Sequence, residues 1–317
     1  MRELMRSNSA TILIAASLLA TLHSAAGSPR MISVAAAPEE FRQKLDSSSG
    51  RPFIVDARAG NALGGANVIF EAVKSGSLDV AVVNGGVVSS GVPELSVFDI
   101  PFLFRDEAHA KAVMQGPVVA KIAEKFADKG LVLLALGKQG FRHMTNSRRA
   151  IRTPDDVKGL TMRVIPNETY KMAFQALGAK VVPMDFTLVY GALKDGRLDG
   201  EENPLTIISD NHFDEVQKHL TLTGHFFTPW VFVANRAMYQ QLSPAEQEAL
   251  VAAAKAGAEA TWREQTDAAK LKELRAAGME VVENVDRQAF ADAVKSLDPE
   301  FEKRFGKELI AAIRSTR

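Results

Sequence analysis

Residues 160–165 read LTMRVI and place one basic side chain, Arg163, inside an alternating apolar strand. Successive side chains of a strand point to opposite faces, so residues 160, 162 and 164 share one face and Thr161 and Arg163 share the other. A compact turn signature, GRLDGEENP, follows at residues 196–204. An arginine in such a strand is either a solvated edge charge or a planar guanidinium that binds a carboxylate. These six residues alone leave both interpretations open.

The N-terminus has the pattern of a secretory signal peptide. Arg2 and Arg6 precede an uncharged apolar run at residues 10–20, and the small residues of Ser24-Ala25-Ala26 predict cleavage after Ala26. The apolar run is too short to cross a bilayer comfortably, although an uncleaved anchor or a buried helix would be the alternatives. No later segment approaches the ~20 apolar residues of a spanning helix. We therefore expect residues 1–26 to be removed from an exported, soluble protein.

The composition excludes several classes of protein. Acidic and basic residues balance at 38 each, so no charge excess indicates nucleic acid or an anionic membrane as a partner. The chain has no cysteine, which excludes disulfides, thiolate chemistry and zinc–thiolate sites. About 290 mature residues suffice for two lobes, and no flexible linker separates them. Several chain crossings between the lobes, and hence a hinged cleft, are the expected arrangement.

Apolar residues alternate between strand and helix periodicity along the chain. This alternation predicts an α/β class with mainly parallel sheets. A Ser-Pro-Ala-Glu start signal at residues 243–246 opens a helical run long enough to lie across two lobes. The continuous apolar run at 131–136 predicts a fully buried strand. The other predicted strands cover 32–35, 53–57, 80–83, 161–165, 180–182 and 230–234, and the helices cover 38–45, 66–75, 108–129 and 243–277.

A weak internal repeat supports two similar lobes. Residues 71–79, EAVKSGSLD, align with residues 191–199, GALKDGRLD, and five of the nine positions are identical. Each copy predicts a helix that ends at a glycine and leads into a short strand, and Asn84 or Asn203 follows. Ligands of open α/β sheets bind outside the carboxyl ends of strands. We therefore expect both asparagines near a cleft.

The sequence gives no positive support for enzyme activity. It contains no GxSxG, HExxH, Walker A or correctly spaced GxGxxG motif. His212, His219 and His225 have a spacing that suits neither a helix face nor a zinc site, so surface or capping roles are favoured over metal binding. Glu201 and Glu202 are adjacent and would point to opposite faces of a strand, which excludes a catalytic carboxylate pair. We expect no catalytic residues, no metal and no cofactor.

Several ordered motifs carry a resemblance to a known family. They are VPELSVFDIPFLF at 92–104, GFRHMTN at 140–146, TPDDVKGLTMRV at 153–164, ALGA at 176–179, PMDFTLVY at 183–190 and DGEENP at 199–204. From about Phe53 to Leu250 the chain resembles the solute-binding proteins of tripartite ATP-independent periplasmic (TRAP) transporters, of the C4-dicarboxylate-binding type.

The resemblance implies an α/β, two-lobe periplasmic-binding-protein fold with a hinged cleft and a long helix spanning both lobes. Residues 27–140 plus about 228–268 would form lobe I, and residues 141–227 plus about 269–317 would form lobe II. Because contiguous α/β lobes follow one another without a flexible linker, we expect the hinge to be formed by the long helix that starts near Ser243 and by the strand crossings near 136–140 and 225–229.

The resemblance also implies roles for five residues. Arg163 would grip a ligand carboxylate as a bidentate fork, and Arg142 would give a second contact. Asn203 and Phe186 would line the same cleft, and Asn84 would contact the ligand from lobe I. Structural alternatives exist for four of them: an ion pair for Arg142, a turn cap for Asn203, ordinary core packing for Phe186 and a structural role for Asn84.

One departure from the family pattern concerns the first strand. In the family a long loop after this strand carries ligand-facing residues, whereas here residues 32–36 run almost directly into the helix at 38–41. Either the loop is lost or the strand pairs differently, which leaves the ligand's identity open.

The predicted function is that of a monomeric periplasmic receptor that delivers an organic-acid anion to the membrane permease subunits of a TRAP transporter. A periplasmic sensor-accessory protein is the alternative, and a secreted enzyme with Glu201 or Glu202 as base is a more remote one.

Overall fold

The structure is a computed structural model that describes residues 30–48, 53–58, 63–263 and 267–317. The predicted signal peptide, residues 1–26, lies outside the described residues. None of the helices in these ranges is both long and apolar enough to cross a membrane. All five predicted site residues lie within the described ranges.

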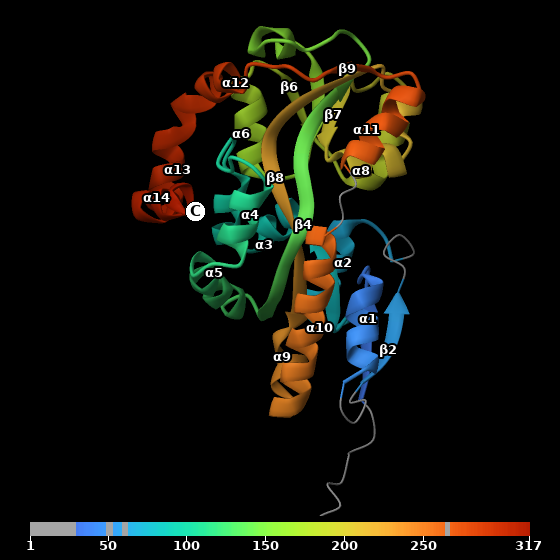
Figure 1. Cartoon of the computed structure of the whole chain (residues 1–317), viewed down its shortest axis with the longest axis vertical. Coiled ribbons are helices and arrows are strands. Elements are labelled where there is room, and N and C mark those ends of the chain that lie inside the picture. The colour runs from blue at the N-terminus through green and yellow to red at the C-terminus, as the bar shows by residue number, and fades with distance from the viewer. Residues whose placement is uncertain (1–29, 49–52, 59–62, 264–266) are drawn as a thin grey trace, which may run out of the picture.

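A single mixed sheet runs through the described part of the molecule (Figure 1). Its strand order is β2-β1-β3-β8-β4-β7-β5-β6, and β9 pairs with β8. The nine strands in the described ranges are β1 (Arg30–Ala35), β2 (Phe53–Arg58), β3 (Val80–Asn84), β4 (Leu131–Asn146), β5 (Thr161–Val164), β6 (Lys180–Pro183), β7 (Gly200–Asn203), β8 (His219–Asn235) and β9 (Glu280–Val282).

The centre of the sheet is antiparallel, which the expectation of mainly parallel sheets does not capture. β8 pairs antiparallel with β3 and β4, and β4 pairs antiparallel with β7. The outer pairs are parallel: β1 with β2 and β3, β5 with β6 and β7, and β8 with β9. Each group of parallel strands is therefore joined to the other through the two long antiparallel strands.

The strands β4 and β8 are much longer than their predicted apolar segments. Residues 137–146, GKQGFRHMTN, continue β4 beyond the apolar run. Local register shifts allow β4 to stay paired with β8 along this irregular sequence. The shifts lie between Leu133 and Ala135, between Lys138 and Gly140, and between Arg142 and Met144. Gly140 has a φ of 124°, a conformation that favours glycine. The expectation of a fully buried strand at 131–136 is wrong, since the side chains of residues 132, 133 and 135 are only half-buried.

Helices cover both faces of the sheet. The α-helices are α1 (Glu39–Asp46), α2 (Ala66–Ser75), α3 (Gly85–Gly91), α4 (Glu107–Met114), α5 (Val118–Ala127), α6 (Glu168–Ala176), α7 (Val189–Lys194), α8 (Leu205–Asp210), α9 (Arg236–Gln240), α10 (Pro244–Arg263), α11 (Asp267–Ala276), α12 (Arg287–Val294), α13 (Asp298–Phe305) and α14 (Lys307–Ser315). Short 3-10 helices are η2 (Pro93–Asp99), η3 (Pro154–Val157), η4 (Phe186–Leu188), η5 (Phe213–Glu215) and η6 (Lys295–Leu297).

Two helical predictions need revision. The single helix expected at 108–129 is wrong: the chain forms α4 and α5, which are separated at Gly116-Pro117. Proline lacks the amide hydrogen that would continue a helix and disfavours the α conformation of the residue before it. The run expected at 243–277 contains α10 and α11, and residues 264–266 between them lie outside the described residues.

The molecule has two lobes joined by β4 and β8 (Figure 1). We call β1–β3, α1–α5 and α10 lobe I, and β5–β7, α6–α8 and α11 lobe II. In lobe I, α10 packs against α1 and β4, whereas in lobe II α11 packs against α8, so the helical run as a whole serves both lobes. The C-terminal helices link the lobes again, since α12 packs against α6 and α14 packs against α5. The predicted lobe boundaries stay a prediction.

The two copies of the sequence repeat adopt the same local structure. In the first, Leu78 N–H donates to Ala72 C=O at 3.0 Å, and in the second Leu198 N–H donates to Ala192 C=O at 3.2 Å. The aspartate that ends each copy accepts a backbone N–H from a strand of the same lobe, from Ser33 to Asp79 and from Thr161 to Asp199, both at 2.8 Å. The strands that follow, β3 and β7, end at Asn84 and Asn203. The repeat thus places one asparagine of each lobe at a strand end.

Candidate functional site

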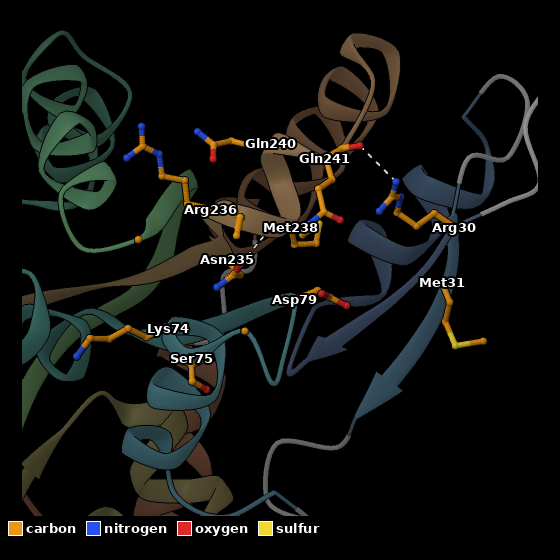
Figure 2. A pocket seen from close by; sticks show the side chains of 13 residues that line it. Arg30, Met31, Lys74, Ser75, Asp79, Asn235, Arg236, Met238, Gln240 and Gln241 are labelled. Carbon is orange, nitrogen blue, oxygen red and sulfur yellow. Dashed lines mark hydrogen bonds between the residues drawn. The ribbon is translucent and has the colours of Figure 1, made fainter.

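One hollow lies at the outer end of lobe I and does not have the features of a specific site. It has a volume of about 800 Å³ and is lined by side chains that include Arg30, Lys74, Asp79, Asn235 and Arg236. These side chains are spread around the hollow rather than converging on one point (Figure 2). Most are already engaged: Asp79 accepts from Ser33, and the Asn235 amide and the Arg236 guanidinium donate to backbone carbonyls. None of the predicted site residues borders it.

A cavity of about 400 Å³ lies between the two lobes and contains four of the five predicted residues. Asn84 reaches it from the end of β3, Asn203 from the end of β7, Arg163 from β5 and Phe186 from the start of η4. The crossing strands contribute Gln139 from β4 and Trp230 from β8. Arg142 does not line the cavity. The repeat and the strand alternation therefore bring residues from distant parts of the sequence to one place.

Arg163 is not a solvated edge charge, because it is only 2% exposed. Its Nε and Nη2 both donate to the backbone carbonyl of Met184, at 3.0 and 2.8 Å, and its guanidinium lies over the ring of Phe186 at 5.8 Å from the centroid. These contacts fix the orientation of the planar group. The remaining terminal nitrogen, Nη1, is buried and has no hydrogen-bond partner in the structure.

Burial lowers the pKa of Arg163 to about 10, so the side chain is still charged at neutral pH. A buried, unpaired charged donor is unfavourable unless something accepts its hydrogen bond. Because Arg163 lines the cavity, an anionic acceptor bound there would satisfy it.

Arg142 forms the structural ion pair that was its alternative interpretation. It is fully buried on β4, and its Nε and Nη2 donate to the two carboxylate oxygens of Glu202 at 2.6 and 3.0 Å. Burial alone would lower the pKa of Arg142, but the Glu202 carboxylate raises it overall. Burial alone would likewise raise the pKa of Glu202, and the charge of Arg142 holds it below its usual value. Both partners are therefore charged.

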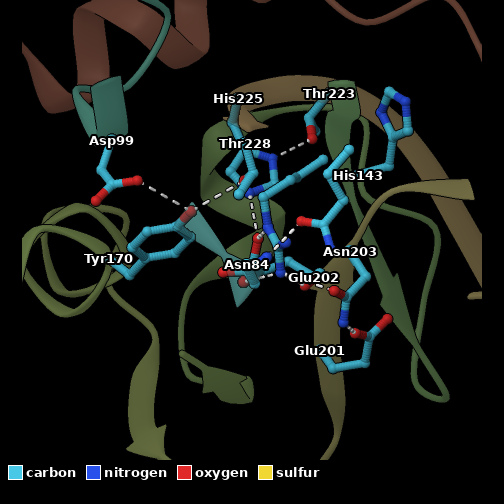
Figure 3. A network of polar contacts seen from close by, with 12 residues as sticks. Asn84, Asp99, His143, Tyr170, Glu201, Glu202, Asn203, Thr223, His225 and Thr228 are labelled. Carbon is cyan, nitrogen blue, oxygen red and sulfur yellow. Dashed lines mark hydrogen bonds and ion pairs between the residues drawn. The ribbon is translucent and has the colours of Figure 1, made fainter. Parts of the chain in front are cut away.

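Asn203 connects this ion pair to the cavity (Figure 3). Its side-chain oxygen accepts from Arg142 Nη2 at 2.9 Å, and its amide donates to the Glu201 carboxylate. Glu201 accepts a second hydrogen bond from the Thr145 hydroxyl at 2.8 Å. Glu201 and Glu202 have separate sets of partners on the two sides of β7, as their adjacent positions predict. The arrangement fixes the orientation of the Asn203 side chain.

Asn84 has a structural role and also lines the cavity. Its side-chain oxygen accepts from Val87 N–H at 3.3 Å and so caps α3, and its amide donates to the side chain of Gln139. Phe186 is half-buried: its ring packs against Phe213 of the lobe II core with centroids 5.8 Å apart, and it borders the cavity as well. Both residues therefore have structural contacts and also line the cavity, and their contact with a ligand stays a prediction.

Part of the wall that lobe I contributes is built from small residues. β1 pairs in regular parallel register with β2 and β3, and only a short connection at Ala36-Ala37 stands where the family pattern has a long loop. Ala36 lines the cavity, and so do Gly64, Gly65 and Ala66 at the start of α2. These positions leave room where longer side chains would fill the space.

Beside the cavity, the lobes share a contact that the sequence did not reveal. The Asn67 amide, in the first turn of α2, donates to the Asp185 carboxylate at 3.1 Å. A Cβ at Gly65 would lie 2.7 Å from Asp185 Oδ1, so only glycine permits this approach. Asp185 belongs to the PMDF motif, but nothing in the sequence indicates that its partner lies 118 residues earlier.

A second polar cluster joins the lobes (Figure 3). The Asn167 amide of lobe II donates to Asp99 Oδ2 and to Gly86 C=O, both at 3.1 Å, and the Tyr170 hydroxyl lies 3.2 Å from the Thr228 hydroxyl. Burial raises the pKa of Asp99 to about 6. The cluster connects lobe I to lobe II next to the first turn of α3, which Asn84 caps.

The histidines do not form a metal site within the described residues, where no cluster of three metal-binding side chains occurs. His212 directly precedes η5, and His219 lies 3.2 Å from the Glu280 carboxylate. His225 is buried between Thr223 and Glu202, at 2.6 and 3.3 Å.

The family model of the bacterial extracellular solute-binding proteins, family 7, matches residues 23–304. A solute-binding protein of Verminephrobacter eiseniae is 40% identical over 281 residues, which cover 88% of this chain and 84% of that protein.

Two solved structures share the fold. A TRAP periplasmic solute-binding protein from Bordetella bronchispeptica, described with density assigned to pantoate, superposes with a TM-score of 0.87 at 38% identity and covers 91% of this chain and 99% of that chain. A TRAP periplasmic solute-binding protein from Polaromonas sp. JS666, bound to D-erythronate, gives a TM-score of 0.86 at 34% identity with coverage of 91% and 99%.

Proposed function

The chain belongs to family 7 of the bacterial extracellular solute-binding proteins, and we propose that it captures an organic-acid anion through Arg163 and delivers it to the membrane permease of a TRAP transporter. The related TRAP proteins with pantoate and D-erythronate are periplasmic binding proteins for organic acids rather than enzymes. The predicted signal peptide would bring this protein to the same compartment.

The observation that carries the proposal is the buried, unpaired Nη1 of Arg163 at the cavity between the lobes. A guanidinium offers parallel N–H donors that match the two oxygens of a carboxylate. Since Nε and Nη2 are held by the Met184 carbonyl, the group is oriented before the ligand arrives. Little conformational freedom then remains to be lost on binding.

The other cavity residues would complete the site in different ways. The ring of Phe186 would cover one side of the ligand, and the amides of Asn84 and Asn203 would bind its polar groups. The observed contacts of Arg142 favour a positioning role, because it holds Asn203 while its charge is balanced by Glu202. A direct contact between Arg142 and the ligand stays a prediction.

Closure of the lobes would exclude water from the carboxylate and strengthen its bond to Arg163, because charges interact more strongly at low dielectric. The contact between Asn67 and Asp185 supports such a closed arrangement. A closed, loaded receptor is the form that a permease would accept.

A thermal-shift screen of the purified protein against organic acids tests the proposal. A ligand that binds only the native state raises the melting temperature, so pantoate, D-erythronate or a related acid should do so. Mass spectrometry should then recover the bound acid unchanged. A full panel of organic acids without any shift, or turnover of the acid, would contradict the receptor function.

A further inference from the structure

We infer that the cavity selects organic monocarboxylates and excludes the corresponding dicarboxylates. The inference rests on the proposed function, because it assumes that the cavity binds an organic acid at Arg163. It goes further by stating which charge the rest of the ligand carries.

The charges around the cavity balance a single anion. Arg163 is the only cation among the described residues that line it. The other ionisable lining residue is acidic: Asp210 stands at the edge, where Lys270 Nζ lies 2.7 Å from its carboxylate. Asp185, which directly precedes the lining residues Phe186 and Thr187, is acidic as well. Among the described residues that line the cavity, a ligand's second carboxylate would therefore meet acids rather than a counter-charge.

Arg142, a buried cation that contacts the cavity residue Asn203, is already paired with a carboxylate. Arg142 does not line the cavity, and Glu202 binds its guanidinium through both carboxylate oxygens. This fully buried pair has no net charge. It can orient Asn203, but it attracts a distant anion only weakly.

The remaining walls are largely apolar. Both lobes contribute to them, with Ile69, Val82 and Val87 from lobe I and Ile165, Ile207 and the ring of Phe186 from lobe II. A carboxylate placed against such walls loses its hydration without a compensating partner, which is strongly unfavourable. A methyl group would instead gain from burial, and a hydroxyl group could bond to the amides of Asn84 or Gln139.

Matched acids separate charge from size. Oxidising the terminal alcohol of D-erythronate gives meso-tartrate, and the same change converts galactonate into galactarate. Each pair has the same carbon chain and nearly the same volume, but the diacid carries one more negative charge. The affinities are measured by titration calorimetry of the intact protein with both pairs. For a pair whose monocarboxylate binds, the affinity for the diacid should be at least about 100-fold lower.

A variant tests whether charge is the cause. Ile207 lines the cavity from α8 and does not belong to the buried core, so the fold should tolerate its replacement. Ile207→Lys adds a second cation, whereas Ile207→Met is a flexible, uncharged control of similar length. The lysine variant should raise the affinity for the diacid at least about tenfold relative to the methionine variant.

The outcomes distinguish the inference from the proposed function. A diacid that binds the wild type within about threefold of its monoacid overturns the inference and leaves the receptor function intact. Equal ratios of monoacid to diacid affinity in Ile207→Lys and Ile207→Met also overturn it, since shape rather than charge would then exclude the diacid. If neither these pairs nor any acid of the thermal-shift panel binds, the proposed function fails and the inference falls with it.

Discussion

Glu201 and Glu202 are neighbours in β7, yet their surroundings shift their pKa values in opposite directions. Glu202 faces the charged guanidinium of Arg142, which holds its pKa below the usual range despite burial. Glu201 receives hydrogen bonds from neutral groups, the Thr145 hydroxyl and the Asn203 amide. Burial raises the pKa of Glu201 to about 7, because these partners do not replace the lost hydration of its charge. A large part of Glu201 is therefore protonated near neutral pH.

Replacing Glu201 by glutamine should stabilise the protein at pH 8 and have little effect near pH 4. The unfolded carboxyl ionises near its ordinary pKa of 4.5, whereas the folded one remains protonated up to about 7. The free energy of unfolding therefore decreases as the pH rises from about 4.5 to about 7. At about 1.4 kcal/mol per pKa unit, the decrease is on the order of 3 kcal/mol. Glutamine does not ionise, and its amide can donate to Thr145, whose hydroxyl can then donate to Gln217. Melting temperatures from pH 4 to pH 8 measure the difference.

The control for this series is Glu248→Gln, which changes an exposed carboxyl on α10. Its melting temperature should follow that of the wild type at every pH. A Glu201→Gln protein that is equally or less stable than the wild type across the whole range would show that Glu201 is ionised in the fold without penalty.

At the residue scale, the sequence predicted where a side chain lies in its strand better than which residue it contacts. Strand alternation placed Arg163 away from its core, and the repeat placed Asn84 and Asn203 at strand ends, because both depend on local periodicity. The partner of Arg142 could not be predicted this way, since Glu202 lies 60 residues later and meets it only when β4 pairs with β7. The short approach of Gly65 to Asp185 depends on tertiary structure in the same way.

Among the elements, the start of α2 and the start of η4 form a contact that would control how long a ligand stays bound. Asn67 and Asp185 come from opposite lobes, and neither residue lines the cavity. The contact exists only while the lobes are close together. It therefore stabilises the closed arrangement without touching the ligand.

Removing this contact by Asn67→Ala should speed ligand release and leave ligand association nearly unchanged. A hydrogen bond contributes about 0.5–1.5 kcal/mol, which corresponds to a roughly two- to tenfold faster dissociation. Stopped-flow displacement measures the rate. Lys74→Ala, on the exposed side of the same helix, is the matched control and should behave as the wild type. An unchanged dissociation rate in a folded Asn67→Ala protein would remove the contact from the closure mechanism.

At the element scale the sequence predicted most helices and strands but not their continuity. α2 has its predicted bounds, because its apolar face is regular and Gly76 ends it in a left-handed conformation. β4 and β8 were underestimated, because their middle sections carry buried polar side chains such as Arg142 and His225 that resemble loop sequence. Pairing with each other satisfies their backbone groups, which composition does not reveal.

The whole molecule should close around its ligand. The lobes are joined by β4 and β8, which run continuously between them with register shifts near Lys138 and Gly140. We predict bending near 136–140 and 225–229, so small-angle scattering should give a smaller radius of gyration with ligand and the mass of a monomer in both states. Identical profiles at saturating ligand would contradict the hinge.

At this scale the two-lobe α/β architecture follows from the resemblance and the alternation of elements, whereas the antiparallel centre does not. Local patterns specify strands, but the direction in which a strand pairs depends on the path of the connecting chain. The long connections that bring β8 between β3 and β4 come from residues far apart in the sequence.

The most direct test of the account is the affinity of Arg163 variants for whichever acid the wild type binds. Arg163→Ala should lose about 2–5 kcal/mol, on the order of thirtyfold to several thousandfold in affinity, and Arg163→Lys should not restore it, because an ammonium lacks the parallel donors of a guanidinium. Arg197→Ala, which removes an exposed arginine of lobe II, should bind normally. Titration calorimetry measures the affinities, and circular dichroism confirms the fold. A folded Arg163→Ala protein that binds within about threefold of the wild type would contradict the central claim that this arginine holds the ligand.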